Sequence, residues 1–147
     1  MRLAIACDHG GFALKMKLIA LLPANQYEIH DFGCYDSASM DYPDVAIPAA
    51  EAVASGDCDK GLLICTTGVG MSICANKVRG VRCALCTNEY MAEMTRRHND
   101  ANMLALGANT VDEKTALRIL QCFMSTPFEG GRHSRRIGKI SEYEENH

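Results

Sequence analysis

A cysteine beside a glycine-rich turn is the stretch of this sequence best suited to chemistry. Cys65 directly follows the apolar run Leu62–Ile64, and two threonines and the glycines Gly68 and Gly70 come next. This order predicts a buried strand, a tight turn and the start of a helix. The free N–H groups of a first helical turn favour negative charge and stabilise a bound anion or a thiolate. The stretch therefore predicts a reactive thiol beside an anion-binding loop; the alternative is an ordinary turn after a buried, inert cysteine.

A carboxylate and a histidine follow the first apolar run of the chain. Asp8 and His9 come directly after the predicted strand Arg2–Cys7. In a parallel sheet the carboxyl ends of the strands meet at one edge, where ligands bind. We therefore expect Asp8 to lie at the same edge as Cys65. An aspartate directly after a strand also commonly caps the next helix. A functional role for Asp8 is favoured because a thiol is expected at the same edge.

His98 is expected at the opposite edge of the predicted sheet from Asp8 and Cys65, because it precedes a strand, at residues 102–106, instead of following one. A strand of this length spans roughly 16 Å, so His98 should not reach Cys65 within one chain. Either His98 is a helix-terminal histidine favoured by the helix dipole, or it serves the site of a neighbouring subunit. The second alternative predicts a dimer with the site across its interface, and it applies equally to Asn99.

Strands and helices alternate along the whole chain. Strands are predicted at residues 2–7, 27–32, 61–64, 81–85 and 102–106, and helices at 12–22, 43–54, 71–78, 88–98 and 112–124. In the first helix, leucines form the apolar face and Lys15 and Lys17 are expected off it. Such alternation predicts one α/β domain over residues 1–147, with a five-stranded parallel sheet between two helical layers. Residues 127–147 are expected to form a tail that ends in a charged segment.

Composition excludes several classes of protein. The net charge of −3 gives no general basic surface for nucleic acid, and no apolar run approaches the ~20 residues of a membrane helix. The N-terminus lacks a signal-peptide pattern, and the eight cysteines lie mostly in or beside apolar runs, without a second pair to complete a zinc set. We therefore expect a cytoplasmic protein with free thiols and no metal. The one basic cluster, at residues 132–136, is large enough to hold a phosphate.

Spacing excludes the common phosphate and nucleotide motifs. A Cys-x5-Arg phosphatase loop needs arginine where Met71 stands, and a dinucleotide fingerprint needs glycine where Ile73 stands. The remaining set comprises a thiol, an anion-binding loop, a carboxylate, histidines and an arginine cluster. It suits proton abstraction next to the carbonyl of a phosphorylated sugar, without a metal or cofactor.

Six motifs, in order, resemble the type B ribose-5-phosphate isomerase family, which includes allose-6-phosphate and galactose-6-phosphate isomerases. They are Cys7-Asp-His-Gly-Gly11, Asp41-Tyr-Pro43, Cys65-Thr-Thr-Gly-Val-Gly-Met-Ser72, Ala75-Asn-Lys77, His98-Asn-Asp-Ala-Asn102 and Gly130-Gly-Arg-His133. The resemblance covers essentially the whole chain. It implies a Rossmann-like three-layer sandwich that forms a homodimer or a dimer of dimers. It also implies cofactor-free interconversion of ribose 5-phosphate and ribulose 5-phosphate.

The resemblance also assigns roles to residues by position. Cys65 would be the base that shuttles the proton through an enediolate, and His98 would open the sugar ring. The anion hole would comprise Thr67 and the backbone amides from Gly68 to Ser72, which include those of Val69 and Gly70; Thr66, a departure from the family, could add a hydroxyl to this substrate-binding turn. Sugar oxygens would contact Asp8, Tyr42 and Asn99, and the phosphate would contact His9, Arg132 and Arg136.

Two positions depart from the family pattern. Thr66 stands where glycine is usual, which is costly only if the backbone there has positive φ. Asn109 stands where an arginine near the phosphate is common. These departures keep open an isomerase of a six-carbon sugar phosphate, or a sugar-phosphate-binding module without turnover.

Overall fold

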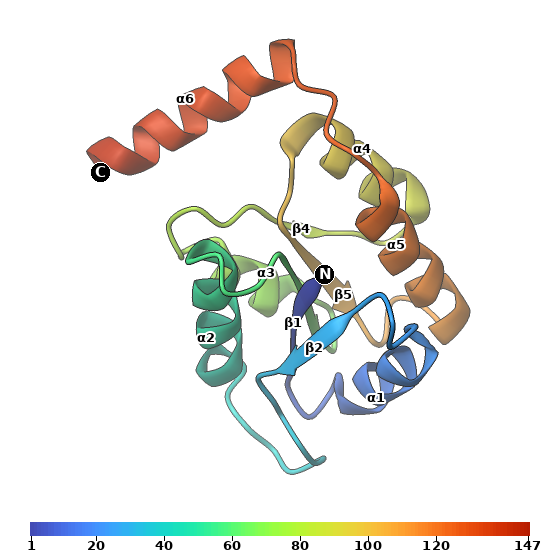
Figure 1. Cartoon of the computed structure of the whole chain (residues 1–147). Helices are drawn as coiled ribbons and strands as arrows, with labels where there is room; N and C mark the ends of the chain where they lie inside the picture. Colours follow the sequence, from blue (N-terminus) through green and yellow to red (C-terminus); the bar gives the residue numbers. More distant parts are fainter.

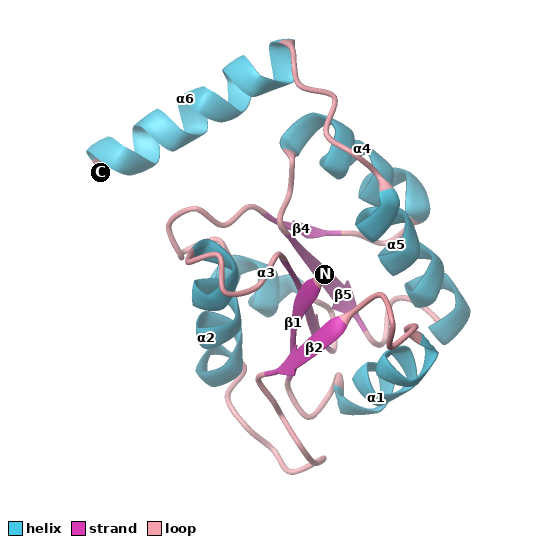
Figure 2. Ribbon diagram, viewed as in Figure 1, coloured by secondary structure: helices cyan, strands magenta, loops and turns pink.

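A five-stranded parallel sheet forms the centre of the protein, described here by a computed structural model of residues 1–147 (Figures 1 and 2). The strands are β1 (Arg2–Cys7), β2 (Glu28–Asp31), β3 (Lys60–Cys65), β4 (Cys83–Leu85) and β5 (Met103–Gly107). Their order across the sheet is β2-β1-β3-β5-β4, and every neighbouring pair is parallel. The α/β fold with a five-stranded parallel sheet, predicted from the alternation of elements, is thus confirmed.

Helices cover both faces of this sheet. They are α1 (Phe12–Leu21), α2 (Pro43–Ala54), α3 (Val69–Ala75), α4 (Glu89–Asn99), α5 (Glu113–Ser125) and α6 (Arg132–Asn146). Helices α1, α4 and α5 lie on one side of the sheet and α2 and α3 on the other (Figure 1). None of the six is both long and apolar enough to cross a membrane.

The central strands are buried on both faces, which explains their continuous apolar sequences. In β1, Leu3 and Ile5 join the core on the α1, α4 and α5 side, whereas Ala4 and Ala6 join the core on the α2 and α3 side. Successive side chains of a strand point to opposite faces, so a strand between two helical layers needs apolar residues at every position.

The C-terminal tail expected at residues 127–147 contains a helix that was not predicted, α6, over residues 132–146. This helix extends away from the sheet (Figure 1). The carboxylate of Glu144 accepts a hydrogen bond of 2.9 Å from the amide of Gly80, so the charged end is held against the body of the protein. The helix has few apolar side chains, and for this reason its sequence did not predict a packed element.

Lys15 is the second difference. It was expected off the apolar face of α1, yet its side chain is fully buried. Its ammonium group lies 2.8 and 2.9 Å from the two carboxylate oxygens of Asp31 and donates to the carbonyl of Cys34 at 2.6 Å. The partner that makes this burial tolerable comes from the end of β2, which the periodicity of α1 does not reveal.

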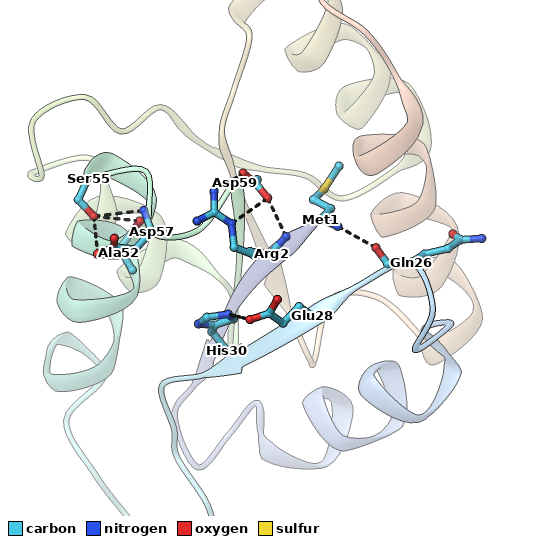
Figure 3. Close-up of polar contacts among 9 residues, drawn as sticks. All are labelled: Met1, Arg2, Gln26, Glu28, His30, Ala52, Ser55, Asp57 and Asp59. Carbon is cyan, nitrogen blue, oxygen red and sulfur yellow. Dashed lines mark hydrogen bonds and ion pairs between the residues drawn. The ribbon is translucent and has the colours of Figure 1, made fainter.

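Polar contacts fasten the amino-terminal edge of the sheet (Figure 3). The backbone amide of Arg2 donates to Asp59 at 2.7 Å, and the guanidinium of Arg2 donates to the same carboxylate at 2.9 Å. Chiefly because of the hydrogen bonds from the Arg2 side chain, the pKa of Asp59 is lowered. These contacts tie the start of β1 to the residue before β3 and leave the other edge of the sheet for ligands.

The buried ion pair generates a stability prediction. Replacing Lys15 with alanine removes the buried ammonium that pairs with the Asp31 carboxylate and donates to the Cys34 carbonyl, so we expect the free energy of unfolding to fall by about 3 kcal/mol. Urea denaturation measures this change. Lys17→Ala is the matched control, because the exposed Lys17–Glu113 pair should contribute below about 1 kcal/mol. Equal losses in the two variants would show that the buried pair has no special role.

Candidate active site

The ends of the three central strands bring Asp8 and Cys65 to one edge of the sheet. Cys7 pairs with Ile64, and Cys65 pairs with Gly107. The amide of Asp8 donates to the carbonyl of Ile64 at 3.2 Å, which joins the turns after β1 and β3. Both side chains are largely buried, with Asp8 8% and Cys65 6% exposed. The structure thus places the carboxylate and the thiol at the same edge.

The sulfur of Cys65 lies under the first amides of the glycine turn. The N–H of Gly68 donates to Cys65 Sγ at 3.1 Å. Gly68 has φ of +77°, and a Cβ there would lie 2.6 Å from the side chain of Leu85 and 2.9 Å from the backbone of Leu106. Only glycine fits both the conformation and the space. The Gly68 amide thus fixes the position of the Cys65 sulfur beneath the turn.

The structure narrows the predicted anion hole. The Gly68 amide is engaged by Cys65, and the Ser72 amide donates within the helix to the Gly68 carbonyl at 3.0 Å. The Ser72 hydroxyl donates to the carbonyl of Val69 at 2.8 Å. The amides of Gly70 and Met71 donate to no group of the chain, because they belong to the first turn of α3. This corrects the expectation that all amides from Gly68 to Ser72 face a ligand.

The two threonines after Cys65 shape the rest of the turn. The hydroxyl of Thr66 lies over Gly10, where a Cβ would come within 2.4 Å of it. Thr66 is not among the residues with positive φ, so its β-branched side chain causes no backbone strain there. The hydroxyl of Thr67 accepts a hydrogen bond of 3.3 Å from the amide of Val69. The first departure from the family pattern therefore adds a hydroxyl beside Asp8.

Asp8 has a structural role beside any functional one. One of its carboxylate oxygens accepts hydrogen bonds from the amides of Gly10 at 2.9 Å and Gly11 at 3.2 Å. The other oxygen accepts no hydrogen bond from the chain. These bonds hold the turn before α1, whose N-cap is Gly11, so Asp8 does not itself cap the helix as the alternative expected. The other carboxylate oxygen remains open to a ligand.

Two further predicted residues lie at this edge: Tyr42, from the loop before α2, and His9, from the turn after β1, which bonds that loop. The ring of Tyr42 packs over Gly70, where a Cβ would lie 2.8 Å from a ring carbon. His9 Nδ1 accepts a hydrogen bond of 3.3 Å from the amide of Met40. Tyr42 is 39% exposed, so its ring covers the start of α3 and also faces solvent.

Asn109, the second departure, lies against the same turn. Its backbone amide donates to the carbonyl of Thr66 at 3.0 Å. Its side chain lines a cavity of about 270 Å³ together with Gly10, Lys17 and Asp112. Position 109 thus adjoins Thr66, and its asparagine brings no positive charge to this cavity.

The remaining predicted residues lie at the other edge of the sheet. The carbonyl of Asn102 accepts a hydrogen bond of 3.0 Å from Gly61, so the start of β5 adjoins the start of β3. His98 and Asn99 precede this point at the end of α4, and Arg132 and Arg136 are exposed on α6. The chain therefore separates them from Cys65, in agreement with the strand-length argument.

His98 has a second histidine as its immediate neighbour. The rings of His98 and His133 stack with centroids 4.3 Å apart and planes at 11°, and His133 Nε2 lies 3.5 Å from a carboxylate oxygen of Glu129. Chiefly because of burial, and secondarily because of the charge of His98, the pKa of His133 is lowered. The donor atoms of His98, Glu129 and His133 lie within 4.8 Å of one another, with the two imidazole rings stacked face to face.

Sequence reasoning missed the arginine that holds the end of α4. The buried Arg96 donates through Nη1 to Asp100 at 2.9 Å and to the carbonyl of Ala101 at 2.6 Å. Arg82 donates from the other side to the carbonyl of Asn99 at 2.8 Å. Asp100 has φ of +44°, which is uncommon for a residue with a side chain. The two arginines therefore fix the turn from which His98 and Asn99 project. The sequence does not single out Arg96, because Arg97 and His98 follow it in the same helical turn.

The glycine turn generates a prediction in which alanine changes stability in opposite directions at two glycines. Gly68→Ala should lower the free energy of unfolding by about 2 kcal/mol or more, because the backbone of Leu106 blocks the new methyl group. Gly138→Ala, in open space on α6, should be neutral or stabilising by up to about 1 kcal/mol. Urea denaturation of both variants measures the difference. A tolerated alanine at position 68 would contradict the packing described for the turn.

Comparison with known proteins matches this geometry to a family. The model of the Ribose/Galactose Isomerase family matches residues 3–140. The ribose-5-phosphate isomerase B of Escherichia coli is 42% identical over 98% of this chain and 97% of its own, and the putative sugar phosphate isomerase YwlF of Bacillus subtilis is 51% identical over 99% and 98%.

Solved structures agree over the same length. The ribose-5-phosphate isomerase B of Clostridium thermocellum superposes with a TM-score of 0.96 at 51% identity and covers 99% of both chains. That of Mycoplasma genitalium, solved with bound ribulose-5-phosphate, gives a TM-score of 0.94 at 42% identity, over 99% of this chain and 97% of its own. The sequence, fold and site together place the chain in the ribose/galactose isomerase family.

Proposed function

We propose that the protein interconverts ribose 5-phosphate and ribulose 5-phosphate, an aldose–ketose isomerisation that passes through an enediolate and needs no cofactor. In this proposal residues 1–147 act as a single isomerase domain. The observation that carries it is the Cys65 sulfur beneath the Gly68 amide, 3.1 Å away, at the edge of the sheet that also holds Asp8. Full-length relatives named ribose-5-phosphate isomerase B support the choice of sugar.

The chemistry divides among the groups at this edge. The Cys65 thiolate removes the proton next to the carbonyl and returns it to the neighbouring carbon. Negative charge then develops on the substrate oxygen, where the unpaired amide of Gly70 and the hydroxyl of Thr67 stabilise it. The open oxygen of Asp8 and the exposed face of Tyr42 are suited to contact sugar hydroxyls.

A second copy of the chain completes the proposed site. His98 opens the sugar ring and Asn99 contacts it, and both act from the neighbouring subunit of a homodimer, or of a dimer of dimers. Large apolar side chains on the face around β4 support this arrangement: Val69, Ile73, Tyr90, Met91 and Ile140 are 39–69% exposed. Val69 and Ile73 belong to α3, so a partner on this face would reach the Cys65 turn.

Two cavities on the same face add to this support. One of about 510 Å³ lies between α6 and β4 and is lined in part by Val81, Ile140 and Glu144. The other, of about 320 Å³, is lined in part by Tyr90 and Met94. Asn99 borders both cavities, and the short edge strand β4 has a neighbour on one side only. The face proposed to bind a second subunit thus carries Asn99, which the site of that second subunit would need.

Arginines supply the phosphate contacts in this proposal. Arg132 and Arg136 are exposed and lie one turn apart on α6, so their side chains project from the same face of the helix. Together with His9 from the facing subunit they would hold a phosphate dianion by charge-assisted hydrogen bonds. The protein would act in the cytoplasm, which its eight free cysteines favour, and its net charge of −3 gives no surface for nucleic acid.

A six-carbon sugar phosphate is the second candidate substrate, and position 109 favours it. Asn109 leaves the cavity of about 270 Å³ beside Thr66 without the arginine that is common in this family. A longer substrate could extend into that space. A sugar-phosphate-binding module is disfavoured, because the chain retains both proposed proton-transfer groups.

The proposed base generates a prediction of its own. Cys65→Ala should lower the turnover of ribose 5-phosphate by about 10²–10⁴-fold while sugar-phosphate binding persists, because only the proton transfer is lost. Coupled turnover assays with ribose 5-phosphate and allose 6-phosphate, beside calorimetric binding, measure this. Cys58→Ala is the matched control, since Cys58 is equally buried but lies at the other edge. Wild-type protein that binds without turning over either sugar would instead support the binding module.

The proposed interface generates a prediction as well. Mixing inactive Cys65→Ala and His98→Asn subunits should restore part of the activity, because one site of each mixed dimer then contains both groups. Subunit exchange is verified separately by mass spectrometry of differently labelled chains. Complete exchange without recovered activity would argue for sites built within single subunits.

A further inference from the structure

Two cysteine thiols that the proposed mechanism does not use are in direct contact. Cys7 Sγ and Cys34 Sγ lie 3.6 Å apart. Their backbones are also joined, because the Cys34 amide donates to the Cys7 carbonyl at 2.6 Å and the Cys7 amide donates to the Gly33 carbonyl at 2.6 Å. A disulfide requires adjacent backbones and sulfur atoms free to approach to ~2.05 Å. No other pair of sulfur atoms in the chain shares such a contact.

The two thiols differ in access. Cys7 is completely buried at the end of β1, whereas Cys34 is 7% exposed and lines a surface cavity of about 320 Å³ with Tyr35, Met40 and Val45. A small neutral oxidant can therefore reach Cys34 from solvent, with Cys7 directly behind it. A reachable thiol backed by a resolving thiol is the arrangement of oxidisable cysteine pairs.

We propose that Cys34 and Cys7 form an oxidisable pair that a hydroperoxide converts into an intramolecular disulfide. In the first step Cys34 sulfur attacks the peroxide, so an S–O bond forms and the O–O bond breaks. The leaving hydroxide takes the thiol proton and departs as water. In the second step Cys7 sulfur attacks Cys34 sulfur, the S–S bond forms, and the S–O oxygen leaves with the Cys7 proton as a second water. Two thiols are oxidised and one peroxide is reduced.

Burial and access assign this order of attack. Burial raises the pKa of Cys7 to about 12, which makes it a poor first nucleophile, while the nearby positive charge of Lys15 opposes that effect. Cys34 Sγ contacts the carbonyl of Asp36 at 3.2 Å, and Asp36 also lines the cavity, so the Cys34 thiol lies on the accessible side of the pair. For the second step, contact at 3.6 Å replaces a bimolecular encounter and compensates for the weak acidity of Cys7. The inference does not depend on the proposed isomerase activity.

Peptide mapping after graded hydrogen peroxide treatment tests the proposal. The folded wild-type protein is oxidised, quenched in acid, alkylated with N-ethylmaleimide and digested without reduction. Trypsin leaves Cys7 in Leu3–Lys15, but it leaves Cys34 and Cys58 together in Leu18–Lys60. Additional cleavage after Glu28 and Glu51 separates these two cysteines. The expected product is a cross-link of the Cys7 and Cys34 peptides that lacks two hydrogen atoms, with the loss of two free thiols per chain.

Single substitutions sharpen the result. Cys7→Ser should abolish the cross-link and let Cys34 proceed to sulfinic acid, and Cys34→Ser should leave Cys7 alkylatable after denaturation. Cys58→Ser, which removes a buried cysteine without a thiol neighbour, should leave the cross-link unchanged. Thermal denaturation and circular dichroism of each variant establish that it is folded. Oxidation of Cys34 beyond sulfenic acid in the wild type, or an unmodified Cys34 when Cys65 is already oxidised, would overturn the proposal.

Discussion

The turn after β1 packs directly on the turn after β3, and the rest of the candidate site depends on that contact. A Cβ on Gly11 would lie 2.4 Å from the carbonyl oxygen of Ile64, and one on Gly10 would lie 2.4 Å from the hydroxyl of Thr66. Two adjacent residues without side chains therefore let the backbones of two neighbouring strands close together at their carboxyl ends. This close approach is what brings the Asp8 carboxylate beside the Cys65 turn.

A second constraint acts within the Cys65 turn itself. Gly68 adopts positive φ, and its amide is then directed at the sulfur of Cys65. The geometry leaves the next amides, of Gly70 and Met71, without partners in the chain. The same backbone turn thus holds the Cys65 sulfur and leaves amide donors free, so the proposed base and the proposed anion hole belong to one local structure.

Buried and half-buried charged side chains fix the segments around this centre. Arg96 and Arg82 hold the end of α4 from two sides, and Lys15 ties α1 to the end of β2 and to Cys34. Buried charges of this kind are costly unless every partner is in place, so each segment has one well-defined position. At the end of α4, that position directs His98 and Asn99 away from the chain's own Cys65.

The sequence by itself determined the alternation of elements, the parallel sheet and the shared edge of Asp8 and Cys65, because apolar runs and glycine turns follow from local physics. It also placed His98 away from Cys65, since strand length alone separates the two. Only the tertiary structure decided which amides of the turn are free, that Thr66 is accommodated, and that Lys15 and Arg96 are buried. Those features depend on partners distant in sequence. Lys15 pairs with Asp31, and the Arg96 guanidinium lies 5.6 Å from the ring of Phe123. Helix α6 likewise depends on tertiary contacts, because its few apolar side chains do not specify a packed position.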